Sequence, residues 1–498
     1  MVKKILALLL ALLMLMSVTV ACSKNDGEAD ESSSESQSVD VSGSEDLYDE
    51  NGYLKDELPE LDYGGYEFDM LGWSSPYRDD FWVAEPSLTS VVETSVYNRN
   101  ETVEERLNVT LEATYIAGDY NHQSEFISYV TNTAYSGADN EFDLICSYSM
   151  CGATLAMNGI TCNLYDLEYL DFDKPWWPEK VVERSEMGGS LYFVTGDAAN
   201  SYLYALNILS VNLNMLDELH LDDPREMVKN GTWTLEKMIE MTKDVGKEAD
   251  GETGKTAGDI YGYSYYSIVQ NDCWLAASGM RISEENSDGV LALTEDFMGE
   301  KVHTLLTTVA TQSKTGDWYH THDASIYING NSLFGGVAID WLDNINAKAI
   351  FKYGVLPFPK VLEGQEEYYT LLGFNYTNFS VPTNAKDPDM SSAVLECMGS
   401  EAYRYSTPVL FETVVKSRFS SSPIDQDMFE IIRSGAYVDA ARLFHGVMES
   451  NFGWRGTPTG LFRSSVTSFT DKSTWISDVN GIKYQVNQML ANISHYMK

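Results

Sequence analysis

The chain has 498 residues, with 75 Asp and Glu against 33 Lys and Arg, and its formal net charge is −42. A field of that sign repels phosphate backbones and anionic lipid, so it argues against nucleic-acid binding and, more weakly, against anionic ligands. Apolar residues make up 44% of the chain and aromatic residues 12%. That composition is sufficient for a large core, and the length favours two or more domains.

The N-terminus has the pattern of a secretory signal. Two lysines precede an apolar run over residues 5–16, which is too short to span a bilayer as a helix. The sequence Thr-Val-Ala-Cys at 19–22 resembles the lipobox of bacterial lipoproteins, in which the cysteine carries lipid, although Thr19 stands where that motif usually has Leu. We expect a lipoprotein signal peptide over 1–21 and lipidation of Cys22 at the extracellular face of a bacterial cell membrane, with simple secretion as the alternative.

Residues 22–62 have the composition of a tether. They are rich in serine and carry fourteen acidic residues against Lys24 and Lys55. A segment with few apolar residues and many like charges cannot bury enough surface to fold, and its charges extend it. We therefore expect a disordered acidic stalk that lifts the folded part off the membrane.

The folded part opens with strand and helix patterns in alternation. Apolar spacing predicts strand 67–71, helix 91–107, strand 109–115, helix 126–134 and strand 142–145. This order is typical of a parallel sheet with helices on its faces. Such sheets bind ligands beyond the carboxyl ends of their strands, so ligand contacts are expected within 72–75 and 147–150.

The middle of the chain repeats this pattern. Strands are predicted at 191–194, 206–212, 335–339 and 353–357, and a helix capped by Thr234 is predicted to run to about Val245. Helices dominate after Pro388, and the last of them covers about 473–496. The chain shows no repeat of fixed period.

A set of short segments, taken in order and spacing, resembles a known family. The segments are 97–100, 103–109, 142–145, 175–177, 191–197, 231–236 and 355–360, of which the first reads Tyr-Asn-Arg-Asn and the last Val-Leu-Pro-Phe-Pro-Lys. Together with the lipobox and the acidic stalk, they make the chain from about Tyr63 similar to the family 1 extracellular solute-binding proteins, the lipid-anchored receptors of ABC sugar importers.

The resemblance implies an α/β, two-lobe periplasmic-binding-protein-like fold with hinge strands and a cleft between the lobes. Carried over by segment, the crossovers fall near 195–200, 373–375 and 420. Lobe one is then expected over 63–196 plus 374–419, and lobe two over 197–373 plus 420–498. The implied function is a monomeric receptor, neither enzyme nor cofactor-dependent, that binds a sugar or oligosaccharide and delivers it to ABC permease subunits.

The chemistry of sugar recognition selects candidate ligand-binding residues. Aromatic rings stack on the C–H faces of a sugar, while carboxylate, amide and hydroxyl groups pair with its hydroxyls. The candidates lie at predicted strand ends, hinges or polar loops, and they are Trp73, Ser75, Asp197, Trp274, Asp340, Trp341 and Asn375. For each tryptophan, packing in the core is the alternative, and Trp176 and Trp177 are interpreted as packing residues.

Other motifs are weaker. His320 and His322 could chelate a metal, but no further ligand lies in a local motif, so no metal is predicted. The acidic turn over 250–259 lacks the alternating carboxylates of a calcium loop. Five cysteines follow Cys22 without paired spacing, which favours buried free thiols and leaves disulfides open; they are Cys146, Cys151, Cys162, Cys273 and Cys397.

Two other functions remain open on the sequence. A secreted glycan-active hydrolase needs two carboxylates that flank the scissile bond, and acidic residues are too frequent here to decide the matter. A surface module that captures glycans without a transporter would share the same composition. The sequence does not specify the sugar, and a peptide or another small solute also stays open.

The lipid anchor can be tested by one substitution. Cys22→Ser is expected to release the mature protein into the medium or to leave it unprocessed, because the serine hydroxyl cannot take the place of the lipidated thiol, while binding by the folded part stays unchanged. Metabolic labelling with a fatty acid, followed by cell fractionation, measures both effects. Continued lipid labelling of the variant would refute the assignment.

Overall fold

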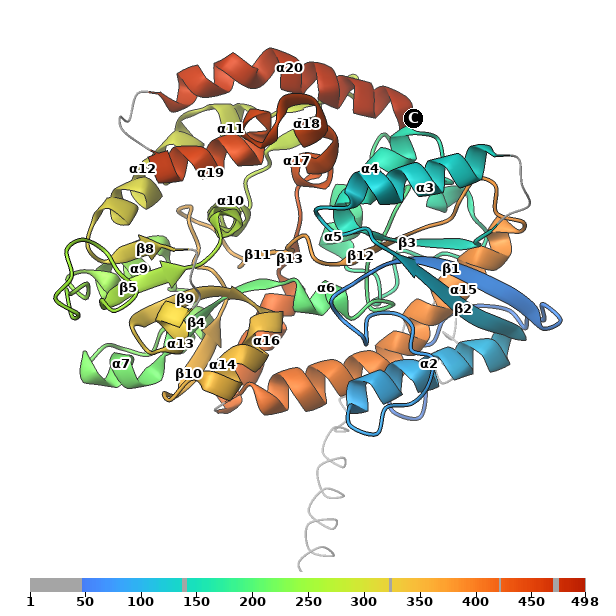
Figure 1. Ribbon diagram of the computed structural model, residues 1–498, viewed down its shortest axis with the longest axis horizontal. Coiled ribbons are helices and arrows are strands. Elements are labelled where there is room, and N and C mark those ends of the chain that lie inside the picture. The colour runs from blue at the N-terminus through green and yellow to red at the C-terminus, as the bar shows by residue number, and fades with distance from the viewer. Residues whose placement is uncertain (1–46, 137–140, 322–324, 421, 469–473, 498) are drawn as a thin grey trace, which may run out of the picture. The chain divides into compact units, whose positions relative to one another are not determined.

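The computed structural model describes residues 47–136, 141–321, 325–420, 422–468 and 474–497 (Figure 1). The expected signal peptide, Cys22, the stalk up to residue 46 and His322, one of the two histidines considered as metal ligands, lie outside the described residues. Residues 48–498 form one unit, which is described here by itself.

The first sheet contains four strands in the order β12-β3-β1-β2. Its strands are β1 (Tyr66–Trp73), β2 (Val109–Ile116), β3 (Leu144–Tyr148) and β12 (Thr377–Ser380). β1 pairs in parallel with β2 and β3, whereas β12 returns antiparallel to β3. Helices α2 (Val91–Leu107) and α3 (Gln123–Tyr135) connect the parallel strands, which confirms the alternation predicted for this part of the chain.

The second sheet contains five strands in the order β10-β4-β9-β5-β8. Its strands are β4 (Asn207–Asn212), β5 (Tyr261–Tyr265), β8 (Trp318–His320), β9 (Ser332–Ala338) and β10 (Tyr353–Leu356). β5 pairs in parallel with β8 and β9, while β4 lies antiparallel between β9 and β10. Because β4 is reversed, its first residue lies at the edge where β5 and β9 end.

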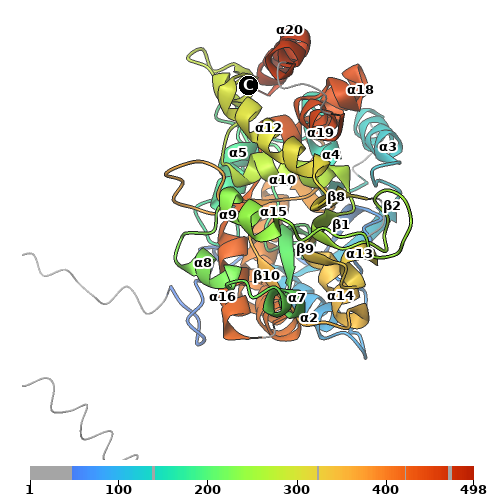
Figure 2. The same ribbon diagram turned by 90° about the vertical axis from the view of Figure 1, so that its left-hand side faces the viewer.

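Each sheet, together with the helices packed against it, forms one part of the unit. Further helices and short strands belong to these two parts (Figures 1 and 2). They are α4 (Ser149–Met157), α5 (Glu179–Ser185), α6 (Ser201–Tyr204), α7 (Leu213–Glu218), α8 (Pro224–Lys229), α9 (Leu235–Thr242), α10 (Asp272–Ala277), β6 (Ser283–Glu285), β7 (Leu291–Leu293), α11 (Glu295–Met298), α12 (Glu300–Lys314), α13 (Ser325–Ile328) and α14 (Leu342–Lys348). The Thr234 hydroxyl accepts from the Lys237 amide at 3.2 Å, so Thr234 is the N-cap of α9, as predicted.

Several segments join the two sheets. The chain passes from β3 to β4 through 194–207 and returns from β10 to β12 through 371–377, and the bridge Leu206–Leu372 pairs these two connections. Beside them, β11 (Thr370–Leu371) pairs in parallel with β13 (Ala436–Tyr437). The strands of the first sheet all fall within the segments expected for lobe one, and those of the second within lobe two; the boundaries themselves stay a prediction.

A long helical run makes a further connection, drawn in orange along the lower edge of Figure 1. It begins with α15 (Pro388–Glu401), which packs against α2, continues through π-helical turns at Ala402–Ser406 and Val409–Lys416, and is followed by α16 (Pro423–Ser434), which packs against β10. Both π-helical segments lie along the chain between α15 and α16, and both contact α2.

The C-terminal helices contact both parts of the unit. They are α17 (Ala440–Leu443), α18 (His445–Phe452), α19 (Pro458–Ser468) and α20 (Trp475–Tyr496). α17 and α18 pack against α4, which follows the first sheet, whereas α19 packs against α12 and α20 against β7. The predicted helical end of the chain is confirmed.

The strand predicted at 191–194 is wrong. This stretch is apolar and buried, but it makes only an isolated bridge from Val194 to Phe379, and the Leu191 amide donates instead to the Asn163 side chain at 2.9 Å. An apolar run of this length is compatible with a buried connection as well as with a strand, and here no neighbouring strand pairs along it.

The folded chain also begins earlier than expected. Within the predicted stalk, Asp56 is buried against Arg106, with an Nη2–Oδ1 distance of 2.7 Å, and it also contacts Arg404 at 3.4 Å. Burial alone would raise the pKa of Asp56, but the hydrogen bond and charge of Arg106 lower it to about 2. The prediction of an unfolded stalk is therefore wrong for residues 53–62. The composition of this segment does not reveal its ion-pair partner Arg106, which lies 50 residues further along the chain.

The five cysteines after Cys22 are free, and all but Cys162 are buried. Burial raises the pKa of the Cys151 thiol to about 12, so it stays protonated at neutral pH. None of the helices in the described ranges is long and apolar enough to cross a membrane.

Replacing Asp56 tests this attachment. Asp56→Asn is expected to lower the free energy of unfolding by about 2–4 kcal/mol, because it removes one of two carboxylates from a pair of arginines and leaves only Glu401 to pair with them. This loss of stability applies above pH 4. It disappears as the pH falls towards 2, because Asp56 in the unsubstituted protein then becomes protonated as well. Urea unfolding at several pH values measures it. Glu60→Gln, at an exposed position, is the matched control, and an equal loss in both variants would contradict the prediction.

Candidate functional site

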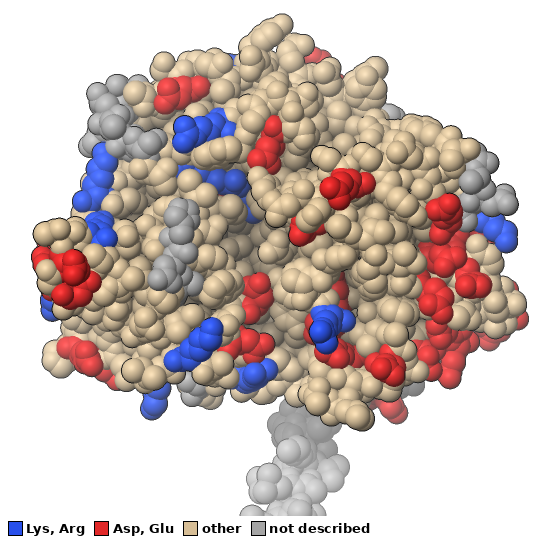
Figure 3. Space-filling model, viewed as in Figure 1, with Lys and Arg blue, Asp and Glu red and all other residues tan. Residues whose placement is uncertain are grey.

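A pocket of about 520 Å³ lies where the carboxyl ends of both sheets meet. From the first sheet it receives Tyr148, the last residue of β3, and Tyr120, from the loop after β2. From the second it receives Tyr266, directly after β5, and Trp341, just after β9. Figure 3 shows a hollow near the middle of this face, with acidic side chains gathered mainly on the right. The topology thus places the pocket at the edge where open sheets bind ligands.

One end of the pocket is aromatic and carries a carboxylate. The rings of Trp341 and Tyr266 lie with centroids 4.6 Å apart, and both line the pocket. Next to them the Tyr77 hydroxyl donates to Asp340 Oδ2 at 2.9 Å. The other oxygen, Oδ1, is buried without a hydrogen bond of good geometry within the described part of the chain. This end therefore offers an apolar face beside a free acceptor.

The carboxylate of Asp340 is unusually basic. Burial raises its pKa to about 6, against the opposing effect of the Tyr77 hydroxyl and the Trp341 backbone amide. Near neutral pH the side chain is largely a carboxylate that accepts hydrogen bonds, and at lower pH it becomes a carboxylic acid that can also donate one. A ligand hydroxyl can pair with either form.

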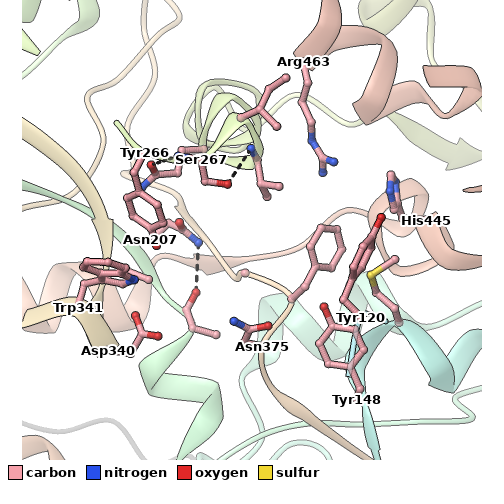
Figure 4. A pocket seen from close by; sticks show the side chains of 18 of the residues that line it. Tyr120, Tyr148, Asn207, Tyr266, Ser267, Asp340, Trp341, Asn375, His445 and Arg463 are labelled. Atoms are coloured by element: carbon pink, nitrogen blue, oxygen red, sulfur yellow. Dashed lines mark hydrogen bonds between the residues drawn. The ribbon is translucent and has the colours of Figure 1, made fainter. Parts of the chain in front are cut away.

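The opposite end is built by the C-terminal helices (Figure 4). Arg463 of α19 and His445 of α18 reach into it, and Tyr120 donates to Glu449 Oε1 at 2.9 Å. His445 lies with Nδ1 3.0 Å from Thr459 Oγ1, and burial together with the nearby Arg463 lowers its pKa to about 3. His445 is therefore neutral at physiological pH.

Arg463 is fixed by a buried carboxylate below the pocket. Its Nε and Nη2 donate to Asp272 Oδ1 and Oδ2 at 2.8 and 2.5 Å, and Arg442 Nη1 donates to the same Oδ2. Arg442 also places its guanidinium 3.7 Å from the ring centroid of Phe374, which forms part of the pocket wall. This cluster connects α10, α17 and α19 with the segment that joins the two sheets.

Three of the residues predicted from sequence line this pocket. Asp340 and Trp341 stand together at its aromatic end, and Asn375, from the connection between β11 and β12, presents its amide to the middle (Figure 4). Ser75 does not line the pocket but accepts a hydrogen bond from the backbone amide of Tyr77 at 3.2 Å, so it supports a lining residue.

The structure places the other predicted residues elsewhere. Trp73 and Trp274 are each 1% exposed and do not line the pocket. Trp73 donates to Thr377 Oγ1 at 2.8 Å, and Trp274 stacks on Trp318 at 5.4 Å, so both have the packing role that was the alternative. Asp197 pairs with Arg433 at 2.9 Å and lines a second hollow beside the Pro-Trp-Trp-Pro segment 175–178.

The sequence reasoning missed several lining residues. Tyr148 and Met150 lie in the segment 147–150, which the strand-end rule had marked, and Tyr266 follows β5, a strand that the spacing did not reveal. The C-terminal contributors are His445, Glu449, Trp454 and Arg463. No local pattern distinguishes these four, because only helix packing brings them to the pocket.

No metal site is visible in the described ranges. They contain no group of three His, Cys, Asp or Glu side chains that could hold an ion. His320, one of the two histidines considered from the sequence, stacks on Tyr265 with ring centroids 5.0 Å apart.

Comparison with known proteins identifies the fold. No protein-family model and no curated protein sequence matches the chain. A cyclo/maltodextrin-binding protein complexed with maltotetraose is similar over 86% of this chain and 99% of its own, with TM-score 0.56 and 12% identity. The cyclic alpha-maltosyl-1,6-maltose binding protein of Arthrobacter globiformis is similar over 86% and 100%, with TM-score 0.54 and 13% identity.

UgpB from Mycobacterium tuberculosis, in complex with glycerophosphocholine, is similar over 86% of this chain and 98% of its own, with TM-score 0.53 and 15% identity. At such identities the similarity shows the fold alone. It confirms the α/β, two-lobe solute-binding fold expected from the sequence.

Trp341 provides a direct test of the pocket. Trp341→Ala is expected to weaken ligand binding by about 2 kcal/mol or more, as for a stacking residue at a binding hot spot, with little loss of stability. A fully buried core tryptophan would instead cost about 3–5 kcal/mol of stability. Calorimetric titration and thermal unfolding of the same variant separate these effects.

Trp82→Ala is the matched control, because Trp82 is partly buried but does not line the pocket. It is expected to leave affinity unchanged. A large drop in melting temperature with normal affinity for Trp341→Ala would reject the site.

Proposed function

We propose that the chain is a cell-surface receptor that binds a sugar or oligosaccharide in the pocket between its two sheets and delivers it to an ABC import permease. The observation that carries the proposal is the composition of the pocket: aromatic rings from both sheets surround a few convergent polar groups. This is the arrangement that a molecule with apolar C–H faces and a ring of hydroxyls requires.

The individual groups support a sugar ligand. Trp341 and Tyr266 offer ring faces next to Asp340, whose free oxygen is an acceptor for a sugar hydroxyl. Asn375 offers both a donor and an acceptor at the middle of the pocket. A hydroxyl left unpaired in such a site would cost about 1–3 kcal/mol, so these polar groups select for ligands that match them.

The lining residues come from both sheets and from a segment between them. This arrangement supports the proposal that the two parts move towards each other on binding. Tyr148 comes from the first sheet, Trp341 from the second and Phe374 from a connection between them. A ligand that contacts all three gains its full interaction only when the two parts close around it. Binding therefore favours the closed state, which a permease can distinguish from the open one.

The remaining parts of the proposal come from the N-terminus and the family resemblance. A lipid on Cys22 would hold the receptor at the extracellular face of the membrane, beside the permease, with the acidic stalk as a flexible spacer. The chain would act as a monomer and without enzymatic activity. Two of the similar proteins named above are sugar-binding proteins by name, which agrees with this assignment.

A glycan-active hydrolase is the second candidate, and one observation favours it. Asp340 has a raised pKa, as a general acid in a glycosidase does, and Glu449 lines the same pocket. However, Asp340 stands at the aromatic end and Glu449 on α18 at the other, where the Tyr120 hydroxyl holds it. Steady release of reducing ends from oligosaccharides, lost in Asp340→Asn, would favour this candidate.

The receptor proposal is tested by binding and compaction. The full chain is screened against a panel of neutral and acidic oligosaccharides by thermal shift, and each hit is studied by X-ray scattering at saturation. We expect the radius of gyration to fall measurably with the correct ligand, because the two parts close on it. A saturating, verified ligand that leaves the radius unchanged would indicate a rigid glycan-capture module instead.

A further inference from the structure

We propose that the ligand carries an oxyanion, such as the carboxylate of a uronic acid or a sulfate ester, and that Arg463 binds this group at the end of the pocket formed by α18 and α19. The inference rests on the proposed function and specifies the class of glycan. It follows from how the donors of Arg463 are used and from the charge of the cluster beneath it.

The guanidinium of Arg463 is only partly occupied by the protein. A guanidinium has five N–H donors, and Asp272 accepts two of them, one from Nε at 2.8 Å and one from Nη2 at 2.5 Å. In the described part of the chain, Nη1 donates to no protein group. The residue is 5% exposed and lines the pocket, so the unused edge is directed to the ligand rather than to bulk water. Two parallel N–H donors on that edge match a carboxylate or sulfate.

The cluster below the pocket has an excess of positive charge. Asp272 is the only acidic partner within ion-pair distance of Arg442 and Arg463 among the described residues, so two guanidinium groups share one carboxylate. Arg442 is 2% exposed, and its Nε and Nη2 have no hydrogen-bond partner among the described groups. An anion at Arg463 would balance this buried charge, which a neutral ligand cannot do.

Among the neighbouring titratable groups, Glu449 offsets part of this charge, because its carboxylate acts on Arg463 through space. His445 adds none, because it is neutral at physiological pH. Glu449 lines the same end, but it forms no ion pair with Arg463, and its carboxylate accepts from Tyr120 at 2.9 Å and lies 3.6 Å from His445. Glu449 is therefore suited to accept hydroxyls of the same sugar ring.

The net charge of the chain, −42, disfavours an anionic ligand, whereas Arg463 favours one. The distance of each charge from the bound ligand decides which of the two dominates. Charges on the outer surface are screened by salt over about 8 Å at physiological ionic strength. Arg463 lines the pocket and is 5% exposed, so its charge is screened less than the charges on the outer surface. The surface field slows the approach of an anionic ligand, whereas Arg463 determines how strongly it is held once it has entered.

The two ends of the pocket then define an orientation. Trp341 and Tyr266, beside Asp340, receive a neutral sugar face, and Arg463 receives the acidic residue (Figure 4). Asp340 would repel an acidic group, so the reversed orientation is disfavoured. The polarity of the pocket thus selects an oligosaccharide with a neutral and an acidic sugar over one that is uniformly charged.

The experiment uses the full chain and pairs of oligosaccharides that share linkage and length but differ in one group. Cellobiouronate with cellobiose tests the carboxylate, and neocarrabiose with and without its sulfate ester tests the sulfate. Calorimetric titration is expected to show at least tenfold tighter binding of the acidic member of the pair that fits. Its affinity should fall as sodium chloride is raised from 50 to 500 mM.

Variants assign this preference to Arg463. Arg463→Gln should reduce the acid-to-neutral affinity ratio at least tenfold, and Arg463→Lys should retain part of it. Arg281→Gln removes an exposed arginine outside the pocket, and it should change nothing. If Arg463→Gln fails to fold, Glu449→Gln provides an independent test, because removal of a nearby carboxylate should increase the preference for the acidic member.

Neutral glycans that bind as tightly as their acidic counterparts would overturn this inference and leave the proposed function intact. The same holds if Arg463→Gln weakens both members of a pair equally. If no glycan of either kind binds, both the inference and the proposed function fail.

Discussion

The pocket depends on the repeated crossing of the chain between its two sheets. Each crossing leaves one sheet at its edge and enters the other sheet. The connections 194–207 and 371–377 cross next to each other and are paired by the bridge between Leu206 and Leu372. β3 of the first sheet and β9 of the second end beside these connections, where the Ser149 amide donates to Tyr376 O and the Ile339 amide to Leu206 O. The residues that follow their carboxyl ends therefore meet, and a concave site with walls from both sheets results.

The C-terminal helices form one end of the pocket. α18 packs on α4 next to the first sheet, and α19 packs on α12 next to the second, so this segment closes one end of the pocket while it touches both parts. The buried Asp272 holds Arg442 and Arg463 in place, and Arg442 in turn supports the ring of Phe374. A buried ion cluster of this kind is costly to break, which makes it a rigid base for the side chains that face a ligand.

The charges of the protein act at two scales. The large negative total repels nucleic acid and anionic lipid headgroups. Within the pocket, individual groups determine the local electrostatic field. They are Asp340, with its pKa raised by burial, at one end and Arg463 at the other. The net charge therefore acts mainly on large partners, which feel the whole field, whereas a small solute enclosed by a few side chains responds to those side chains.

The sequence by itself determined the α/β class, most of the elements and the rule that ligands bind beyond strand ends, because these follow from local apolar spacing and capping. Asp340 and Trp341 were predicted from the end of a strand and Asn375 from a hinge that the family resemblance implied, and all three line the pocket. Only the tertiary structure decided that Trp73 and Trp274 are core residues, that residues 53–62 pack through Asp56, and that Arg463 and His445 reach the pocket. Burial, ion pairing and helix packing join residues that are far apart in the chain, and no short pattern in the sequence records such contacts.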